Sequence, residues 1–131
     1  MSSPGNQRGA GTDERKARGQ RAERLAAEYL SAQGYSILST NWRCRSGELD
    51  LIAEQDGGIV IIEVRSRSSH ALSYGLPSES ITPRKIRKVR ATAAVYLQQS
   101  GKLTAPVRFD VITVLFQADA EPKLEHIEAA F

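Results

Sequence analysis

The chain has 131 residues, of which 40% are hydrophobic and 25% are charged, with a formal net charge of +3. Its single cysteine, Cys44, excludes an internal disulfide and a zinc site built from several cysteines. No apolar run approaches the roughly 20 residues of a membrane span, and the N-terminus lacks the apolar core of a signal peptide. We therefore expect a soluble cytoplasmic protein without a membrane partner, and the small positive charge favours a polyanionic partner.

The N-terminal segment differs in composition from the rest of the chain. Residues 1–12 are mostly Ser, Pro, Gly, Asn and Arg, and we expect a disordered basic tail there. A single domain is expected over residues 13–131. It starts with a helix over 12–33, in which apolar residues recur at three- and four-residue spacing, and Gly34 suits the end of that helix.

Three strands are predicted after the first helix. They cover residues 35–43, 48–54 and 59–65, where β-branched and aliphatic residues are frequent. The last two are separated by a segment containing Asp56-Gly57, which is typical of a tight β-hairpin turn. The pattern therefore predicts an antiparallel hairpin in the first half of the domain.

The second half begins with a strong helix start signal. Thr82 suits an N-cap and Pro83 the first helical position, and the predicted helix runs to Gln99. Further strands are expected at 107–116 and 124–127. The order αβββαββ predicts an α/β domain with a central mixed sheet flanked by helices.

The hairpin places two acidic residues together. If Asp56-Gly57 forms a two-residue turn, Asp50 lies directly opposite Glu63, with Cβ atoms roughly 4.5–5.5 Å apart on one face. If the loop has three residues, the two side chains become diagonal neighbours, still within roughly 7–8 Å.

Two carboxylates at this distance repel each other unless one is protonated or a cation lies between them. A hard divalent cation such as Mg²⁺ takes carboxylate oxygens. Arg65 follows Glu63 by two residues and shares its face. The alternative is a plain ion pair of Asp50 or Glu63 with Arg65, Arg43 or Arg108, and both interpretations remain open at this point.

Short motifs follow one another in order between residues 19 and 116. They are Gly19-x-x-x-Glu23, Tyr29-Leu30, Gly34-Tyr35, Asn41-Trp42-Arg43, Gly47-Glu48-Leu49-Asp50-Leu51-Ile52, Glu63-Val64-Arg65-x-Arg67, Lys85, Tyr96-Leu97 and Arg108-x-Asp110. This ordered set closely resembles the YraN family of uncharacterised bacterial proteins. That family is similar to Holliday junction resolvases of the PD-(D/E)XK nuclease superfamily.

The resemblance implies a restriction-endonuclease-like fold and a metal site for Mg²⁺ or Mn²⁺. It implies that Asp50 and Glu63 are catalytic metal ligands, joined by the carbonyl of Val64 and by Glu23 from the first helix. Glu48 is the acidic residue beside Asp50 in the motif. Strand alternation places Glu48 on the same face, as an accessory ligand or as a salt-bridge partner.

Arg65 departs from the superfamily pattern, which has lysine at this catalytic position. The resemblance implies that the lysine orients or helps deprotonate the attacking water and stabilises the charged phosphorane. Arginine can stabilise charge but cannot act as a base, because its pKa exceeds about 12. Arg65 can also fold over Glu63 in a two-pronged ion pair and block the site, while Lys85 or Lys88 is a candidate to replace the lysine.

The second predicted helix begins with a basic cluster, five cations in the seven residues from Arg84 to Arg90. The helix macrodipole disfavours positive charge at this end, which favours contact with phosphates. A solvated helix face is the alternative. The residues expected to bind nucleic acid are Arg67, Arg84, Lys85, Arg87 and Lys88.

Three functions are compatible with these patterns. The first is a metal-dependent endonuclease acting on nucleic acid, with branched or duplex DNA as the expected substrate and a homodimer as a way to cut both strands of a junction. The second is a catalytically inactive nucleic-acid-binding module of the same fold. The third is a structural or interaction protein with a buried ion-pair network. His126 has no ligand-like spacing and is predicted to be a surface residue.

Overall fold

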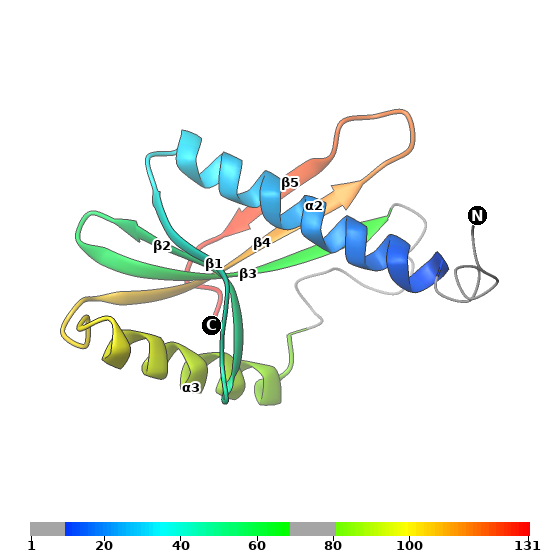
Figure 1. The fold of residues 1–131 in the computed structure, drawn as a ribbon. Coiled ribbons are helices and arrows are strands. Elements are labelled where there is room, and N and C mark those ends of the chain that lie inside the picture. The colour runs from blue at the N-terminus through cyan, green and yellow to red at the C-terminus, as the bar shows by residue number, and fades with distance from the viewer. Residues whose placement is uncertain (1–9, 69–80) are drawn as a thin grey trace, which may run out of the picture.

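A five-stranded sheet lies between two helices in the computed structural model, which describes residues 10–68 and 81–131 (Figure 1). The elements are α2 (Ala10–Ala32), β1 (Ser36–Cys44), β2 (Gly47–Gln55), β3 (Gly58–Ser68), α3 (Pro83–Gln99), β4 (Val107–Phe116) and β5 (Lys123–Ile127). The predicted α/β class and mixed sheet are confirmed. Within the described ranges, neither helix is long and apolar enough to cross a membrane.

The sheet has the strand order β1-β2-β3-β4-β5. Only β3 and β4 are parallel neighbours, and the other neighbouring pairs are antiparallel. Because a parallel pair needs a long crossover, α3 lies between β3 and β4 in the chain. Figure 1 shows α2 on one face of the sheet and α3 on the other.

Each helix covers its own hydrophobic core. Ala22, Ala26 and Leu30 of α2 are fully buried in a cluster with Leu51 and Ile62 of the sheet. On the opposite face, the buried residues of α3 pack against another set of strand residues. The members of this second core cluster are Leu49, Ile52, Ile59, Ile61, Val89, Ala93 and Tyr96.

The helix boundaries are close to those predicted. The first helix begins at Ala10, so residues 10–12, which the sequence assigned to the tail, are helical. Residue composition predicts helix ends only to within one or two positions, which explains this correction. The rest of the predicted tail, residues 1–9, lies outside the described residues. The start of α3 is confirmed, with the Thr82 hydroxyl accepting the Lys85 N–H at 3.1 Å.

The β2–β3 hairpin has the predicted two-residue turn. Asp56 and Gly57 have φ angles of 52° and 81°, as expected for a turn whose twist matches that of the flanking strands. Gln55 pairs with Gly58, and the register continues without a shift to Leu51 and Ile62. The predicted register is therefore confirmed over these five pairs of residues.

The regular alternation of β2 breaks at Asp50. Leu51 packs in the core under α2, whereas Leu49 packs in the core under α3. In a regular strand, residues two apart share a face, so the strand must twist sharply between them. Asn41, on the neighbouring strand β1, has a positive φ of 50° close to this point. Simple alternation therefore does not place Glu48 relative to Asp50.

Candidate active site

Asp50 and Glu63 come together where the ladder between β2 and β3 ends. The backbone N–H of Asp50 lies 3.5 Å from Oε2 of Glu63, and the N–H of Val64 donates to Oδ2 of Asp50 at 2.9 Å. The Asp50 carboxylate therefore occupies the position of a strand partner for the Val64 N–H. Each carboxylate thus lies against the backbone of the other strand, one step beyond the last paired residues of the ladder, Leu51 and Ile62.

Burial makes both carboxylates costly to ionise. Glu63 is only 2% exposed, and burial together with the charge of Asp50 raises its pKa to about 7, although Lys85, the Asp50 N–H and Arg65 oppose this. Burial also raises the pKa of Asp50, against the Val64 N–H and the charges of Arg65 and Lys85. Two such groups titrate as a pair, and a bound cation would hold both in the charged form.

The nearest cation to Glu63 comes from the second helix. The ammonium of Lys85 lies 4.0 Å from Oε1 of Glu63. Arg65, in contrast, forms no ion pair with Glu63 among the described contacts, and its Nε is buried without a hydrogen-bond partner there. The predicted two-pronged ion pair of Arg65 over Glu63 is therefore wrong. Arg65 stands on the same strand as Glu63, and its charge lowers the pKa of both carboxylates without a direct ion pair to Glu63 in the part of the chain that the structure describes.

Glu23 and Glu48 lie at the margin of this pair. Both line a hollow of ≈ 460 Å³ beside α2, together with Asn41 and Arg43. Glu48 forms an ion pair with Arg43, in which Oε2 of Glu48 lies 2.9 Å from Nε of Arg43, and both side chains are mostly exposed. Burial and then Asp50 raise the pKa of Glu23, while a hydrogen bond from Asn41 lowers it. Glu23 and Glu48 therefore act on Asp50 through their charge, and Glu48 takes the predicted salt-bridge role.

The donor chemistry of the pair fits a hard divalent cation. Asp50 and Glu63 offer carboxylate oxygens, and Mg²⁺ commonly uses one or two carboxylates together with water and phosphate oxygens. No group of three or more His, Cys, Asp or Glu side chains that could hold a metal occurs within residues 10–68 and 81–131. The site as it stands therefore offers two carboxylate side chains, and a bound metal would need further ligands from backbone, water or substrate.

The basic cluster reaches the carboxylates through Lys85, whose Nζ lies 4.0 Å from Oε1 of Glu63. Its four predicted nucleic-acid-binding members on α3 are all exposed. Lys85 and Lys88 line a hollow of ≈ 430 Å³ under the β1–β2 turn, with Gly47 and Glu48 on its other side. The four exposed residues on α3 are Arg84, Lys85, Arg87 and Lys88. The fifth residue predicted to bind nucleic acid, Arg67, lies on β3 and is half-buried.

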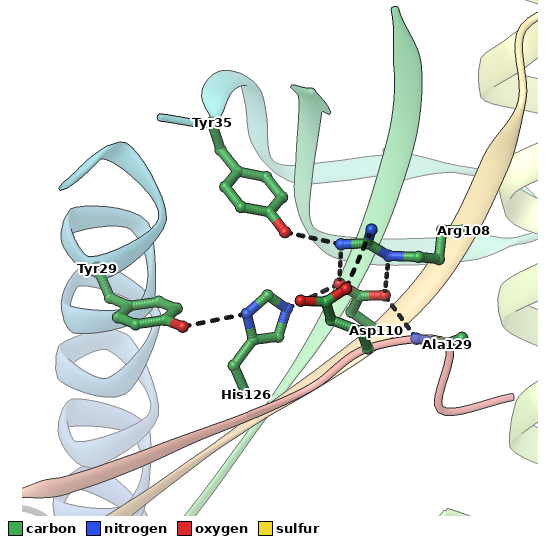
Figure 2. Close-up of polar contacts among 7 residues, drawn as sticks. Tyr29, Tyr35, Arg108, Asp110, His126 and Ala129 are labelled. Atoms are coloured by element: carbon green, nitrogen blue, oxygen red, sulfur yellow. Dashed lines mark hydrogen bonds and ion pairs between the residues drawn. The ribbon is translucent and has the colours of Figure 1, made fainter. Parts of the chain in front are cut away.

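A second polar cluster, on the edge of the sheet, involves residues that the sequence did not bring together (Figure 2). Asp110 is fully buried and accepts two hydrogen bonds of 2.8 Å from Arg108. It also accepts the Ala129 N–H at 3.0 Å and lies 2.7 Å from Nε2 of His126. Burial alone would raise the pKa of Asp110, but these hydrogen bonds outweigh it and the pKa is lowered.

Two tyrosines extend this cluster to the first helix and the start of β1. The Tyr29 hydroxyl lies 3.3 Å from Nδ1 of His126, and the Tyr35 hydroxyl accepts a hydrogen bond from Arg108 at 2.7 Å; Figure 2 shows both tyrosines pointing toward this cluster. His126 is therefore not a surface residue, since its side chain is only 7% exposed. Arg108 pairs with Asp110, which removes it as a partner for the Asp50–Glu63 pair. The signal in the sequence was the Arg108-x-Asp110 spacing, which puts both side chains on one strand face.

The fold and the site define an α/β protein that holds a buried and a half-buried carboxylate, Glu63 and Asp50, beside a basic helix. The chain belongs to the uncharacterised protein family UPF0102, whose sequence pattern matches residues 22–114. It is 43% identical to the UPF0102 protein of Renibacterium salmoninarum over 109 residues, which cover 83% of this chain and 91% of the relative.

Relatives from other bacteria match over similar lengths. The UPF0102 protein of Pelotomaculum thermopropionicum is 47% identical over 120 residues, which cover 91% of this chain and 98% of the relative. The UPF0102 protein of Geobacter sulfurreducens is 38% identical over 123 residues, or 94% of both chains. The family relationship therefore covers the whole region that contains the site.

Proposed function

We propose that this protein is a cytoplasmic, metal-dependent endonuclease of the PD-(D/E)XK superfamily, with a restriction-endonuclease-like fold. The observation that carries the proposal is the convergence of the Asp50 and Glu63 carboxylates at the end of the β2–β3 ladder. A buried carboxylate, Glu63, and a half-buried one, Asp50, both with raised pKa values, destabilise a fold in their charged forms unless a cation binds between them. Selection for a bound divalent cation is a direct reason to keep such a pair.

The roles of the residues follow from their chemistry. Asp50 and Glu63, with the carbonyl of Val64, would hold Mg²⁺ or Mn²⁺, with Glu23 close enough to contribute through its charge. When bound, such an ion polarises a phosphate and lowers the pKa of a coordinated water. Arg65 supplies a fixed positive charge near Asp50, which suits stabilisation of the extra negative charge of a phosphorane.

The substrate is proposed to be DNA, with branched or duplex molecules as the first candidates. The first two turns of α3 carry exposed cations, of which Lys85 reaches Glu63, and a phosphate backbone there would relieve their repulsion with the helix macrodipole. A homodimer would allow both strands of a junction to be cut by one assembly. These partners rest on the basic surface and on the resemblance to Holliday junction resolvases.

The test is a cleavage screen over junction, duplex and single-stranded DNA and RNA with Mg²⁺ or Mn²⁺. We expect wild-type protein to cut, and Asp50→Asn to be inactive because it removes a ligand charge with little change in shape. Glu54→Gln is the matched control, since Glu54 lies on the same strand but is 39% exposed and pairs with Lys102. Cleavage that survives Asp50→Asn would contradict the proposal.

Two other outcomes identify the alternative functions. Tight, salt-dependent binding of DNA without cleavage under any metal would favour an inactive nucleic-acid-binding module. Absence of both DNA binding and Mn²⁺ binding would favour a structural protein in which the carboxylates belong to an ion-pair network.

A further inference from the structure

The cation beside Glu63 comes from α3 and not from the strand that carries the carboxylate. Lys85 lies 22 residues after Glu63 in the chain, yet its Nζ is 4.0 Å from Oε1 of Glu63. Arg65 stands two residues after Glu63, at the position of the superfamily lysine, but forms no ion pair with it among the described contacts. The two cations therefore lie at different distances from Glu63 and need not have the same role.

The position of Lys85 is fixed by the start of its helix. Thr82 caps α3, and its hydroxyl accepts the backbone N–H of Lys85 at 3.1 Å. Pro83 occupies the first helical position, where its restricted φ favours the helix. The backbone of Lys85 is therefore held in place, and only its flexible side chain needs to move to meet a ligand of Glu63.

The geometry leaves the ammonium group of Lys85 available. At 4.0 Å, the Nζ–Oε1 distance exceeds the roughly 2.7–2.9 Å of a direct charge-assisted hydrogen bond. The side chain is also 44% exposed, so it reaches solvent. An ammonium carries three donors on a rotatable stem, which here can reach a water or a phosphate oxygen next to Glu63.

Lys88 and Arg65 are less suited to this task. Carbon atoms of the Lys88 side chain lie 3.1 and 3.6 Å from the position that a Cβ on Gly47 would take, so its stem is packed against the β1–β2 turn. Arg65 has a buried Nε and a rigid guanidinium that stays charged and cannot act as a base.

We infer that Lys85 is a catalytic residue that orients the attacking water beside Glu63, in the role that the superfamily assigns to the motif lysine. Arg65 keeps the part of that role that a fixed charge can perform, close to Asp50. This inference rests on the proposed endonuclease function. It assigns the reactive ammonium to the first turn of α3, and it explains how an arginine at the motif position is compatible with cleavage.

Single-turnover cleavage at saturating DNA separates this role from DNA binding. Lys85→Met keeps the length of the stem but removes the charge. Lys102→Met is the matched control, since Lys102 is also partly exposed but, within the described residues, pairs with Glu54 and with neither carboxylate of the candidate site. Because saturating DNA removes the effect of weaker binding, only Lys85→Met should lower the single-turnover rate, by about 100-fold or more. A rate for Lys85→Met within threefold of the Lys102→Met rate would overturn the inference.

A rescue variant tests the chemistry of the ammonium. In the Lys85→Met background, Arg65→Lys restores an ammonium at the superfamily position and should recover cleavage at least about tenfold. Loss of cleavage in Lys85→Met with recovery in the double variant supports the assignment, because a merely structural defect on α3 would not be repaired from β3.

Mn²⁺ affinity gives a readout that does not depend on cleavage. Because Lys85 is the cation nearest to Glu63, its removal should tighten Mn²⁺ binding several-fold relative to wild type, whereas Lys102→Met, which removes the partner of Glu54, should leave the affinity unchanged. If wild-type protein binds Mn²⁺ but cuts no substrate, the proposed function fails, and tighter binding by Lys85→Met still supports the placement of Lys85. Equal Mn²⁺ affinity in the two variants would overturn it.

Discussion

Replacing Glu63 by glutamine should make the metal-free protein more stable at alkaline pH. The pKa of Glu63 is raised from 4.5 to about 7, first by burial and then by Asp50. The folded protein therefore binds this proton more tightly than the unfolded chain, and the stability due to this group is present below pH 4.5 and is lost as the pH rises through 7. At 1.36 kcal/mol per pKa unit, ionised Glu63 costs about 3 kcal/mol at pH 8 and less than about 1 kcal/mol at pH 5.

The assay is urea unfolding followed by far-UV circular dichroism, at pH 5 and pH 8 with EDTA present. Glu63→Gln should exceed wild type in its free energy of unfolding by up to about 3 kcal/mol at pH 8, and by less than about 1 kcal/mol at pH 5. Glu54→Gln, which changes a partly exposed carboxylate on the neighbouring strand, should show no such pH-dependent gain. If wild type is as stable as Glu63→Gln at pH 8, the burial argument for this carboxylate is wrong.

Three further predictions concern other parts of the molecule. Asp110→Asn should lower the free energy of unfolding by about 3 kcal/mol at pH 7. The loss should be smaller in acid, because the pKa of Asp110 is lowered and its carboxylate stabilises the fold only when it is ionised. Urea unfolding at pH 7 and pH 3 checks this. Gly47→Ala should lower the melting temperature, since Gly47 has a φ of +149° and the added Cβ would lie 3.1 Å from Lys88; an unchanged value would contradict this packing. Replacing Arg84 and Arg87 by alanine should weaken DNA binding and reduce the slope of log affinity against log salt concentration by about two units. Fluorescence anisotropy across a salt series measures this slope, and an unchanged slope would show that this face of α3 does not contact DNA phosphates.

Local chemistry explains why much of the fold was predictable. The Asp56-Gly57 turn has both residues at positive φ, which few residue pairs accept, so the turn and the register that follows from it could be inferred from two letters. The start of α3 was equally local, because Thr82 and Pro83 are the cap and the first residue themselves. In both places the residues that carry the signal are the residues that form the structure.

The parts that could not be predicted depend on residues far apart in the chain. The contact of Lys85 with Glu63 needs the crossover of α3 to place its first turn beside the hairpin, and no local pattern encodes that placement. His126 looked like a surface residue because its partner Asp110 lies on another strand, 16 positions earlier. The alternation of side chains along a strand did not predict the break at Asp50, because the break depends on the packing of Leu49 and Leu51 under different helices.

The two-residue turn also restricts how this gene can vary. Asp50 and Glu63 are separated by 13 positions, and both depend on a continuous register that starts at Gln55 and Gly58. A single inserted or deleted codon between them would shift the pairing by one residue and turn one carboxylate to the opposite face. Lineages within UPF0102 that keep the site should therefore exchange residues freely along this hairpin but retain its length, whereas a lineage with a longer or shorter hairpin should also have lost the acidic pair.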